Sequence, residues 1–280
     1  MWGRAGGRTC GIVALCLALM SCSQTGNRHT QAAGPPFARA TAGPAEHPHP
    51  LTEHPAPPAL TVPGTVVKGG QGAAGGLVPV RRIGDLPGSE VGPADKVVAL
   101  TFDDGPDPVF TPRVLDVLAQ YHVPATFFML GWEAAASPDL VRRVAAAGDG
   151  VGSHTWNHLD LTRLGEAGLA VQVDRTGALL SAETGWTVTC IRPPQGHENP
   201  RLVRRLSERG LTTVLWSADT RDWTRPGTDT IVRRALAGLS PGTIILLHDG
   251  GGDRGETLAA LPRIIESVQS QGYRLVPICH

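Results

Sequence analysis

The strongest constraint on the fold is an alternation of short strand-like runs with helix-period segments from about residue 95 to the C-terminus. Consecutive runs start 25 to 37 residues apart, which is the spacing of βα units whose strands run parallel. Seven such units predict a closed or nearly closed α/β barrel. An open doubly wound sheet is the alternative, because spacing alone does not show closure. The predicted strands are 97–102, 125–130, 150–153, 187–191, 213–217, 243–248 and 274–278.

Residues 1–22 have the pattern of a bacterial export signal. Positive charge near the start is followed by an apolar core, residues 11–20, that is too short to span a bilayer. Cys22 ends a segment that resembles the lipobox of lipoproteins, so we predict a lipid anchor at Cys22 on the extracytoplasmic face of the membrane. Simple cleavage and secretion is the alternative, because Met20 is an unusual neighbour for a lipidated cysteine.

Residues 23–94 are predicted to be a disordered linker. Half of the 24 prolines of the chain precede residue 94, and the segment has too little apolar surface to offset the entropy of ordering. The remaining domain, residues 95–280, holds 18 basic and 21 acidic side chains. This balance lacks the basic footprint of nucleic-acid binding, so nucleic acid is excluded as a partner.

Only two cysteines, Cys190 and Cys279, fall in this domain. In an oxidising compartment they could form one disulfide. The predicted strand layout places them on strands that are not neighbours, so we expect two separate, small buried side chains instead.

Polar residues gather where the predicted strands end. The carboxyl ends of parallel strands converge on one face, where active sites of α/β folds lie. This placement predicts one functional site on that face. The residues are Asp103 and Asp104 after the first strand, His154 after the third, Arg192 after the fourth, Asp219 and Asp222 after the fifth, and His248 after the sixth.

One of these residues, His154, has the spacing of a metal ligand to a second histidine. His154 and His158 are four residues apart, which can place both imidazoles on one side of a turn. A carboxylate from the first strand would complete a His–His–Asp site with open positions, which suits a catalytic Zn²⁺. The same ligand set also describes Fe(II) oxygenases.

Asp103 and Asp104 can serve two purposes, because neighbours at a strand end point in different directions. One carboxylate can bind the metal while the other accepts a proton from water. Arg192 could keep that base ionised, and His248 is suited to protonate a leaving group. Ordinary salt bridges are the structural alternative for Arg192 and Asp222.

Five segments in order resemble the motifs of the polysaccharide deacetylases, the NodB-homology domain of carbohydrate esterase family 4. The resemblance covers about residues 95–280. The segments are Thr101-Phe102-Asp103-Asp104-Gly105-Pro106, Ser153-His154-Thr155-Trp156-Asn157-His158, Arg192-Pro193-Pro194-Gln195-Gly196, Asp219-Thr220-Arg221-Asp222-Trp223 and Leu246-Leu247-His248.

The resemblance implies a distorted (β/α)₇ barrel that hydrolyses N-acetyl or O-acetyl groups on sugars with a divalent metal, usually Zn²⁺. By the same resemblance, Asp104, His154 and His158 are the metal ligands.

The resemblance also implies the acid and the base. Asp103 is the catalytic base, which Arg192 orients. His248 is the catalytic acid, and Asp222 tunes it.

The substrate side of the site is expected to include one departure. The resemblance places Trp223 and Leu246 around the acetyl methyl group. Gln195 stands where the family usually has an aromatic residue, but the expected contribution there is a backbone N–H towards the oxyanion, which glutamine keeps. We therefore expect activity to persist and substrate preference to change.

The predicted function is metal-dependent removal of acetyl groups from an extracellular polysaccharide, with release of acetate. Peptidoglycan is favoured for an envelope-tethered enzyme, and chitin oligomers and acetylated xylan are alternatives. A non-catalytic glycan-binding module on the same fold, an Fe(II) oxygenase and another carbon–nitrogen hydrolase are the competing classes.

Overall fold

The computed structural model describes residues 77–279. The predicted signal peptide, Cys22 and residues 23–76 of the predicted linker lie outside the described residues. Within 77–279, none of the helices combines the length and apolar character needed to cross a membrane.

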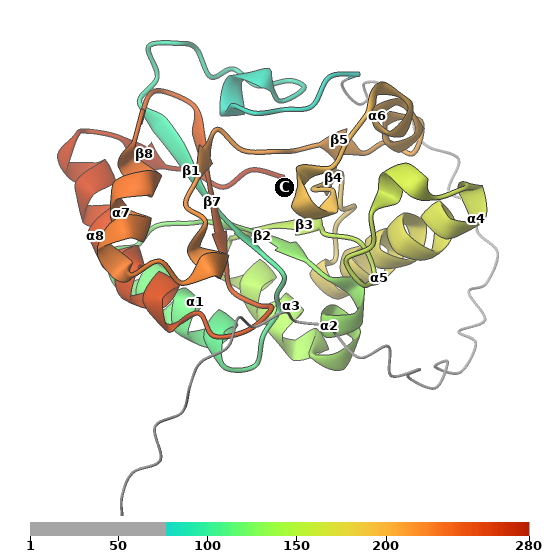
Figure 1. Cartoon of the computed structure of the whole chain (residues 1–280), viewed down its shortest axis with the longest axis horizontal. Helices are drawn as coiled ribbons and strands as arrows, with labels where there is room; N and C mark the ends of the chain where they lie inside the picture. Colours follow the sequence, from blue (N-terminus) through green and yellow to red (C-terminus); the bar gives the residue numbers. More distant parts are fainter. Residues whose placement is uncertain (1–76, 280) are drawn as a thin grey trace, which may run out of the picture. The chain divides into compact units, whose positions relative to one another are not determined.

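The strands form one parallel sheet, as their spacing predicts (Figure 1). The order is β5-β4-β3-β2-β1-β7-β6, and β8 pairs with the beginning of β1. The strands are β1 (Val97–Asp103), β2 (Thr126–Met129), β3 (Gly150–Ser153), β4 (Cys190–Ile191), β5 (Thr212–Thr213), β6 (Ala218–Asp219), β7 (Thr243–His248) and β8 (Arg274–Leu275).

The fifth predicted strand, 213–217, is two short strands in the structure. β5 pairs with β4, whereas β6 pairs with β7 on the other end of the sheet. The chain therefore leaves one end of the sheet after β5 and joins the other end at β6. The result is a parallel half-barrel with an opening between these two strands, which corrects the expectation of a continuous strand here.

Residues 80–86, called the N-terminal strap below, connect the two sides of this opening. Val80 bridges to Val214 just after β5, and Arg82 bridges to Thr243 at the start of β7. Val80 and Ile83 are 1% and 3% exposed. These buried side chains and backbone hydrogen bonds offset the entropy of ordering. This part of the predicted disordered linker is therefore folded, and the packed domain begins before residue 95.

Helices cover the outer face of the sheet (Figure 1), and α8 packs against α1 and α7. The helices are α1 (Phe110–Tyr121), α2 (Gly131–Ala136), α3 (Pro138–Ala146), α4 (Glu166–Leu169), α5 (Arg175–Thr184), α6 (Pro200–Ser207), α7 (Thr228–Leu236) and α8 (Gly255–Ser270). A π-helical turn, η3 (Ala170–Asp174), lies between α4 and α5.

The two faces of β1 explain where the polar residues go. Val98, Leu100 and Phe102 belong to the large apolar cluster shared with the helices. The alternate residue Ala99 belongs to the cluster inside the half-barrel. Because side chains alternate across a strand, Asp103 falls on this interior side, at the carboxyl end of β1.

The C-terminal segment shows that the expectation of two separate cysteine side chains is wrong. After β8 the chain runs past β2, where the backbone N–H of Ile278 donates to the Thr126 hydroxyl at 2.8 Å. Gly150 permits this approach, because a Cβ there would lie 2.1 Å from the Ile278 carbonyl oxygen. Cys279 thereby reaches β4 and forms a disulfide with Cys190, with Cα atoms 5.6 Å apart. The expectation failed because it placed Cys279 at the end of a last strand, 274–278, that does not neighbour the strand of Cys190, whereas β8 already ends at Leu275 and the chain then leaves the strand direction.

Candidate active site

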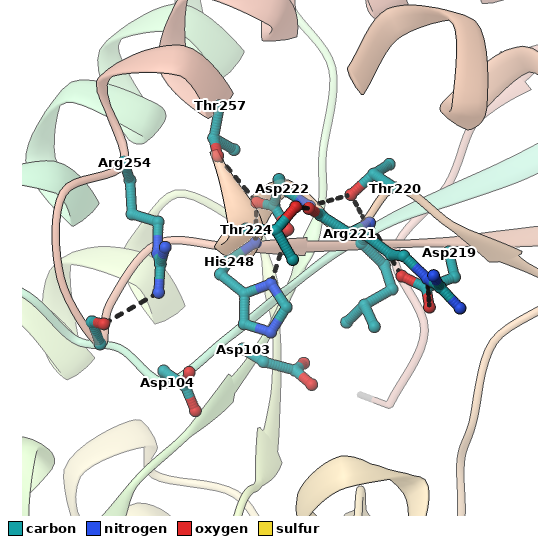
Figure 2. Close-up of polar contacts among 12 residues, drawn as sticks. Asp103, Asp104, Asp219, Thr220, Arg221, Asp222, Thr224, His248, Arg254 and Thr257 are labelled. Carbon is teal, nitrogen blue, oxygen red and sulfur yellow. Dashed lines mark hydrogen bonds and ion pairs between the residues drawn. The ribbon is translucent and has the colours of Figure 1, made fainter. Parts of the chain in front are cut away.

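The predicted polar residues of β1 and β7 meet at the carboxyl ends of the strands. Asp103 and His248 are register partners on these adjacent strands. Figure 2 shows the His248 imidazole between Asp222 and Asp103, with Asp104 beside them. The strand-end pattern therefore correctly located one shared rim.

Arg192 fixes the position of Asp103. Its guanidinium donates to Asp103 Oδ1 at 2.7 Å and to the Thr101 hydroxyl at 2.9 Å. The other guanidinium nitrogens donate to the carbonyl oxygens of Val214 and Leu215. Arg192 is fully buried, so its planar group has a single hydrogen-bonded position, and Asp103 Oδ1 is part of it.

Two opposing effects set the ionisation of Asp103. Burial is the larger effect and raises the pKa of this carboxyl above its ordinary value, although the charges of Arg192 and His248 and the hydrogen bond from Arg192 act to lower it. Arginine keeps its proton in proteins. Its contact therefore favours the carboxylate, which is the form that can accept a proton.

Asp104, His154 and His158 converge as predicted for metal ligands. Their candidate ligand atoms all lie within 4.8 Å of one another. Asp104 Oδ1 is 3.4 Å from His154 Nε2 and 3.6 Å from His158 Nε2. Asp104 and His158 have left-handed backbones, with φ of 74° and 65°, as strained residues at functional sites often do.

The donor set fits a divalent cation. His154 Nδ1 lies 2.7 Å from the Arg192 carbonyl oxygen, which can only accept, so Nδ1 carries the proton and Nε2 presents a lone pair to the cluster. Burial lowers the pKa of His154 to about 3, although Asp104 acts in the opposite direction, so the ring is neutral. Among the described residues, the buried Asp104 Oδ1 has no hydrogen-bond donor. A neutral imidazole and an unsatisfied carboxylate oxygen are what a metal ion requires.

Asp222 holds the opposite side of His248. His248 Nδ1 lies 2.7 Å from Asp222 Oδ1, and the His248 backbone N–H donates to Asp222 Oδ2 at 2.8 Å. The Thr257 hydroxyl donates to the same Oδ2 at 2.7 Å (Figure 2). These bonds fix the ring plane and direct Nε2 towards the rim.

The same contacts make His248 a proton donor near neutral pH. Burial alone would lower the pKa of His248, but Asp222, with smaller contributions from Asp104 and Asp103, raises it to about 9. Burial acts to raise the pKa of Asp222, but the charge and hydrogen bonds of His248 and the bond from Thr257 bring it below its ordinary value. The pair is therefore an imidazolium bound to a carboxylate.

The three predicted substrate residues lie on strands and turns of this rim. Leu246 precedes His248 by two residues on β7 and therefore shares its face. Trp223 is 56% exposed on the turn that follows β6. Gln195 has a left-handed backbone, with φ of 58°, on the turn after β4.

Sequence reasoning missed several residues that support the site. Thr101 is two residues before Asp103 and faces the same way, so strand alternation could have identified it. Thr257 could not be found in this way, because it reaches Asp222 from α8, 35 residues away. Gly250 packs against the Asp104 backbone, where a Cβ would lie 2.2 Å from the carbonyl oxygen.

Comparisons with known proteins agree with this geometry. A family model described as polysaccharide deacetylase matches residues 90–214. A peptidoglycan-N-acetylglucosamine deacetylase of Bacillus cereus is 41% identical over 191 residues, covering 68% of this chain and 89% of the relative. A chitooligosaccharide deacetylase of Rhizobium leguminosarum bv. trifolii is 44% identical over 205 residues, covering 69% and 95%.

A solved structure extends the likeness to the fold. The crystal structure of a peptidoglycan N-acetylglucosamine deacetylase superposes with a TM-score of 0.65 at 37% identity, covering 67% of this chain and 88% of that one. Together with the fold, this level of identity makes the chain a member of the polysaccharide deacetylases of carbohydrate esterase family 4, hydrolases that act on N-acetyl amide bonds.

Proposed function

We propose that this protein removes N-acetyl groups from peptidoglycan with the help of a zinc ion and releases acetate. The observation that carries the proposal is the separation of roles around one cluster. Asp103 is bonded to Arg192 and His248 is bonded to Asp222, and the cluster of Asp104, His154 and His158 lies beside this pair of residues.

Asp103 acts as the general base. As water attacks the acetamide carbon, one of its protons passes to the Asp103 carboxylate, and the new C–O bond forms. Arg192 keeps Asp103 ionised and aimed, because its other hydrogen bonds hold the guanidinium in one place. A positioned base of this kind contributes about 10²–10⁴ in rate.

Asp104, His154 and His158 are the residues that would hold the metal. A zinc ion bound there would supply Lewis acidity towards the acetamide carbonyl and towards water. The exposure of the His158 side chain, 36%, leaves one side of this cluster open to substrate, as a catalytic site requires.

His248 completes the reaction as the general acid. When the C–N bond breaks, the imidazolium donates its Nε2 proton to the leaving nitrogen, and the sugar amine departs from acetate. The raised pKa of His248 keeps this proton available at neutral pH.

Gln195, Trp223 and Leu246 complete the substrate side. The Gln195 backbone N–H donates to the acetyl oxygen as negative charge develops on it. Leu246 and Trp223 surround the methyl group. The exposed Gln195 side chain stands on one wall of the sugar groove, where the family usually has an aromatic ring. This difference affects which polymer the enzyme prefers.

Two lines of support favour peptidoglycan. Similar proteins include a peptidoglycan-N-acetylglucosamine deacetylase, and the predicted lipid anchor at Cys22 would keep the enzyme beside the cell wall. A Cys22→Ser variant should leave the membrane fraction. An unchanged membrane fraction for this variant would contradict the anchor.

Acetate release tests the function. The zinc-loaded protein is assayed on peptidoglycan, chitooligosaccharides and acetylxylan, with peptidoglycan expected to react fastest. Asp103→Asn and His248→Ala should each lower kcat about 10²–10⁴-fold. Near-normal turnover by both variants would refute the assigned roles. Zinc occupancy without acetate release from any of these polymers would instead favour a non-catalytic glycan-binding module.

A further inference from the structure

The loop that carries His158 adopts a backbone conformation that needs support from elsewhere. Thr155 and His158 have φ of 73° and 65°, and such left-handed conformations cost non-glycine residues about 1–3 kcal/mol each. The His158 N–H donates to the Thr155 hydroxyl oxygen at 3.0 Å, which closes the turn. The N–H groups of Trp156 and Asn157, between them, are directed away from this turn.

Gln172 binds both of these groups. Its Oε1 accepts from the Trp156 N–H at 3.1 Å and from the Asn157 N–H at 3.2 Å. Its Nε2 donates to Asn157 Oδ1 at 2.7 Å. Gln172 itself is 4% exposed, so its end of these three bonds is shielded from competing water.

The π-helical turn η3 presents Gln172 to the loop. An extra residue in a helical turn displaces the chain and is often found at functional sites. Here the Gln172 carbonyl accepts a hydrogen bond from the Thr176 hydroxyl at 3.0 Å. The Thr176 hydroxyl thus stabilises the irregular turn. The side-chain amide of Gln172 remains available to bind the loop that carries His158.

The two histidines differ in how they are held. The His154 ring is fixed by the Arg192 carbonyl oxygen and is 3% exposed. The His158 side chain is 36% exposed, and its ring makes a polar contact with Asp104, the third member of the cluster. The aim of His158 therefore depends mainly on the backbone of its own loop.

We propose that Gln172 is a positioning residue for the metal site: by holding Trp156 and Asn157, it fixes the loop that aims His158 at the cluster. This inference rests on the proposed function, because it requires that Asp104, His154 and His158 bind a cation. Loss of Gln172 leaves two backbone N–H groups without their acceptor and allows the strained loop to relax.

The test measures Zn²⁺ affinity by equilibrium competition with a colorimetric chelator, with the metal alone and no substrate. Gln172→Met keeps the length and helix propensity of glutamine and removes all three bonds. We expect it to weaken Zn²⁺ binding about 10–100-fold, as loss of a group behind a metal ligand does. Gln172→Glu keeps an acceptor for the N–H groups of Trp156 and Asn157. Its Zn²⁺ affinity should stay close to that of wild type.

Ser181→Ala is the matched control. Ser181 lies on α5 and accepts a hydrogen bond from the Val188 N–H at 3.0 Å, so the variant also loses a side-chain acceptor for a backbone donor. It should leave Zn²⁺ affinity unchanged.

If Gln172→Met does not fold, Asn157→Ala replaces it. Asn157 is exposed, and this variant removes only the bond from Nε2, so a smaller loss of affinity is expected.

A second readout separates positioning from general damage. At saturating Zn²⁺, Gln172→Met should recover most of the wild-type kcat, while the Zn²⁺ concentration for half-maximal activity rises. Wild-type affinity in Gln172→Met, or an equal loss in Ser181→Ala, would overturn the role of Gln172 and leave the proposed function intact. A wild-type protein that fails to bind Zn²⁺, or binds it without releasing acetate, would overturn the proposed function itself.

Discussion

Replacing Asp222 by asparagine should convert His248 from a proton donor into a neutral ring at neutral to alkaline pH. In the native protein the Asp222 carboxylate accepts from the ring and from the backbone of His248. Burial opposes the imidazolium, and Asp222 is the largest effect that favours it. Without that charge, burial dominates, and the pKa of His248 should fall to 6.5 or lower.

The size of the effect follows from the two pKa values. The rise from 6.5 to about 9 corresponds to about 3 kcal/mol in favour of the imidazolium. At pH 8, a ring with a pKa of about 9 is roughly 90% protonated, whereas a pKa of 6.5 leaves about 3%. Asp222→Asn should therefore lower the protonated fraction of His248 about 30-fold at pH 8 in metal-free protein. In the zinc-loaded enzyme kcat/KM at pH 8 should fall by up to this factor, and the loss should shrink as the pH falls.

The assay combines a ¹⁵N NMR titration of the His248 ring with kcat/KM measured across pH. Asp104 also favours the imidazolium, and a bound cation would neutralise that contribution, so the titration uses metal-free protein. Asp219→Asn is the control, because Asp219 lies three residues before Asp222, at the end of β6, and accepts a hydrogen bond from the Arg221 N–H instead of from His248. An unchanged His248 titration in Asp222→Asn would refute the reasoning.

Three further predictions concern stability. Replacing Cys190 and Cys279 together by serine should lower the free energy of unfolding by about 2–5 kcal/mol, and reductant should then no longer shift the urea midpoint as it does for wild type. Val80→Ala should cost about 1–3 kcal/mol in urea unfolding and lower kcat, because the strap bonds to the segment whose carbonyls hold Arg192. Burial raises the pKa of Asp249 to about 7. The folded state then holds this proton more tightly than the unfolded state, so metal-free wild type should lose stability from about pH 4 through 7, and Asp249→Asn should lose less.

Each of these has a specific contrary result. A reductant-sensitive midpoint in the double serine variant would show that other chemistry causes the shift. Val78→Ala, at a position that is 73% exposed, should be neutral, and an equal loss there would argue against a special role for Val80. Parallel pH curves for wild type and Asp249→Asn would contradict a buried, protonated Asp249.

The rim could be predicted because strands impose simple rules. Asp103 and His248 each end a strand, and His154 directly follows one. Parallel strands bring such ends together whatever the helices between them do. His154 and His158 are four residues apart, so a single turn of the chain is enough to bring their two rings to the same side. These signals are local, so they can be read from the chain without knowing its packing.

The strap and the disulfide could not be predicted for the opposite reason. Val80 and Cys279 lie beyond the first and last strands, in segments whose composition says little about what they touch. Val80 is buried because the half-barrel leaves an opening after β5. Cys279 reaches Cys190 because the chain passes Gly150 instead of continuing β8. Both outcomes depend on the finished shape of the sheet.

In the proposed reaction, a general acid and a general base can coexist on this rim because each is bonded to its own oppositely charged partner. Asp103 and His248 are adjacent across β1 and β7, and the charge of each favours the ionised form of the other. Arg192 supplies the opposing charge that Asp103 needs as a carboxylate, and Asp222 supplies the one that His248 needs as an imidazolium. Environments that hold the two groups in different protonation states define which is acid and which is base. Each role therefore depends on a pair of residues. Removing Arg192 should disable Asp103 as a base, and removing Asp222 should disable His248 as an acid, although Asp103 and His248 themselves stay in place.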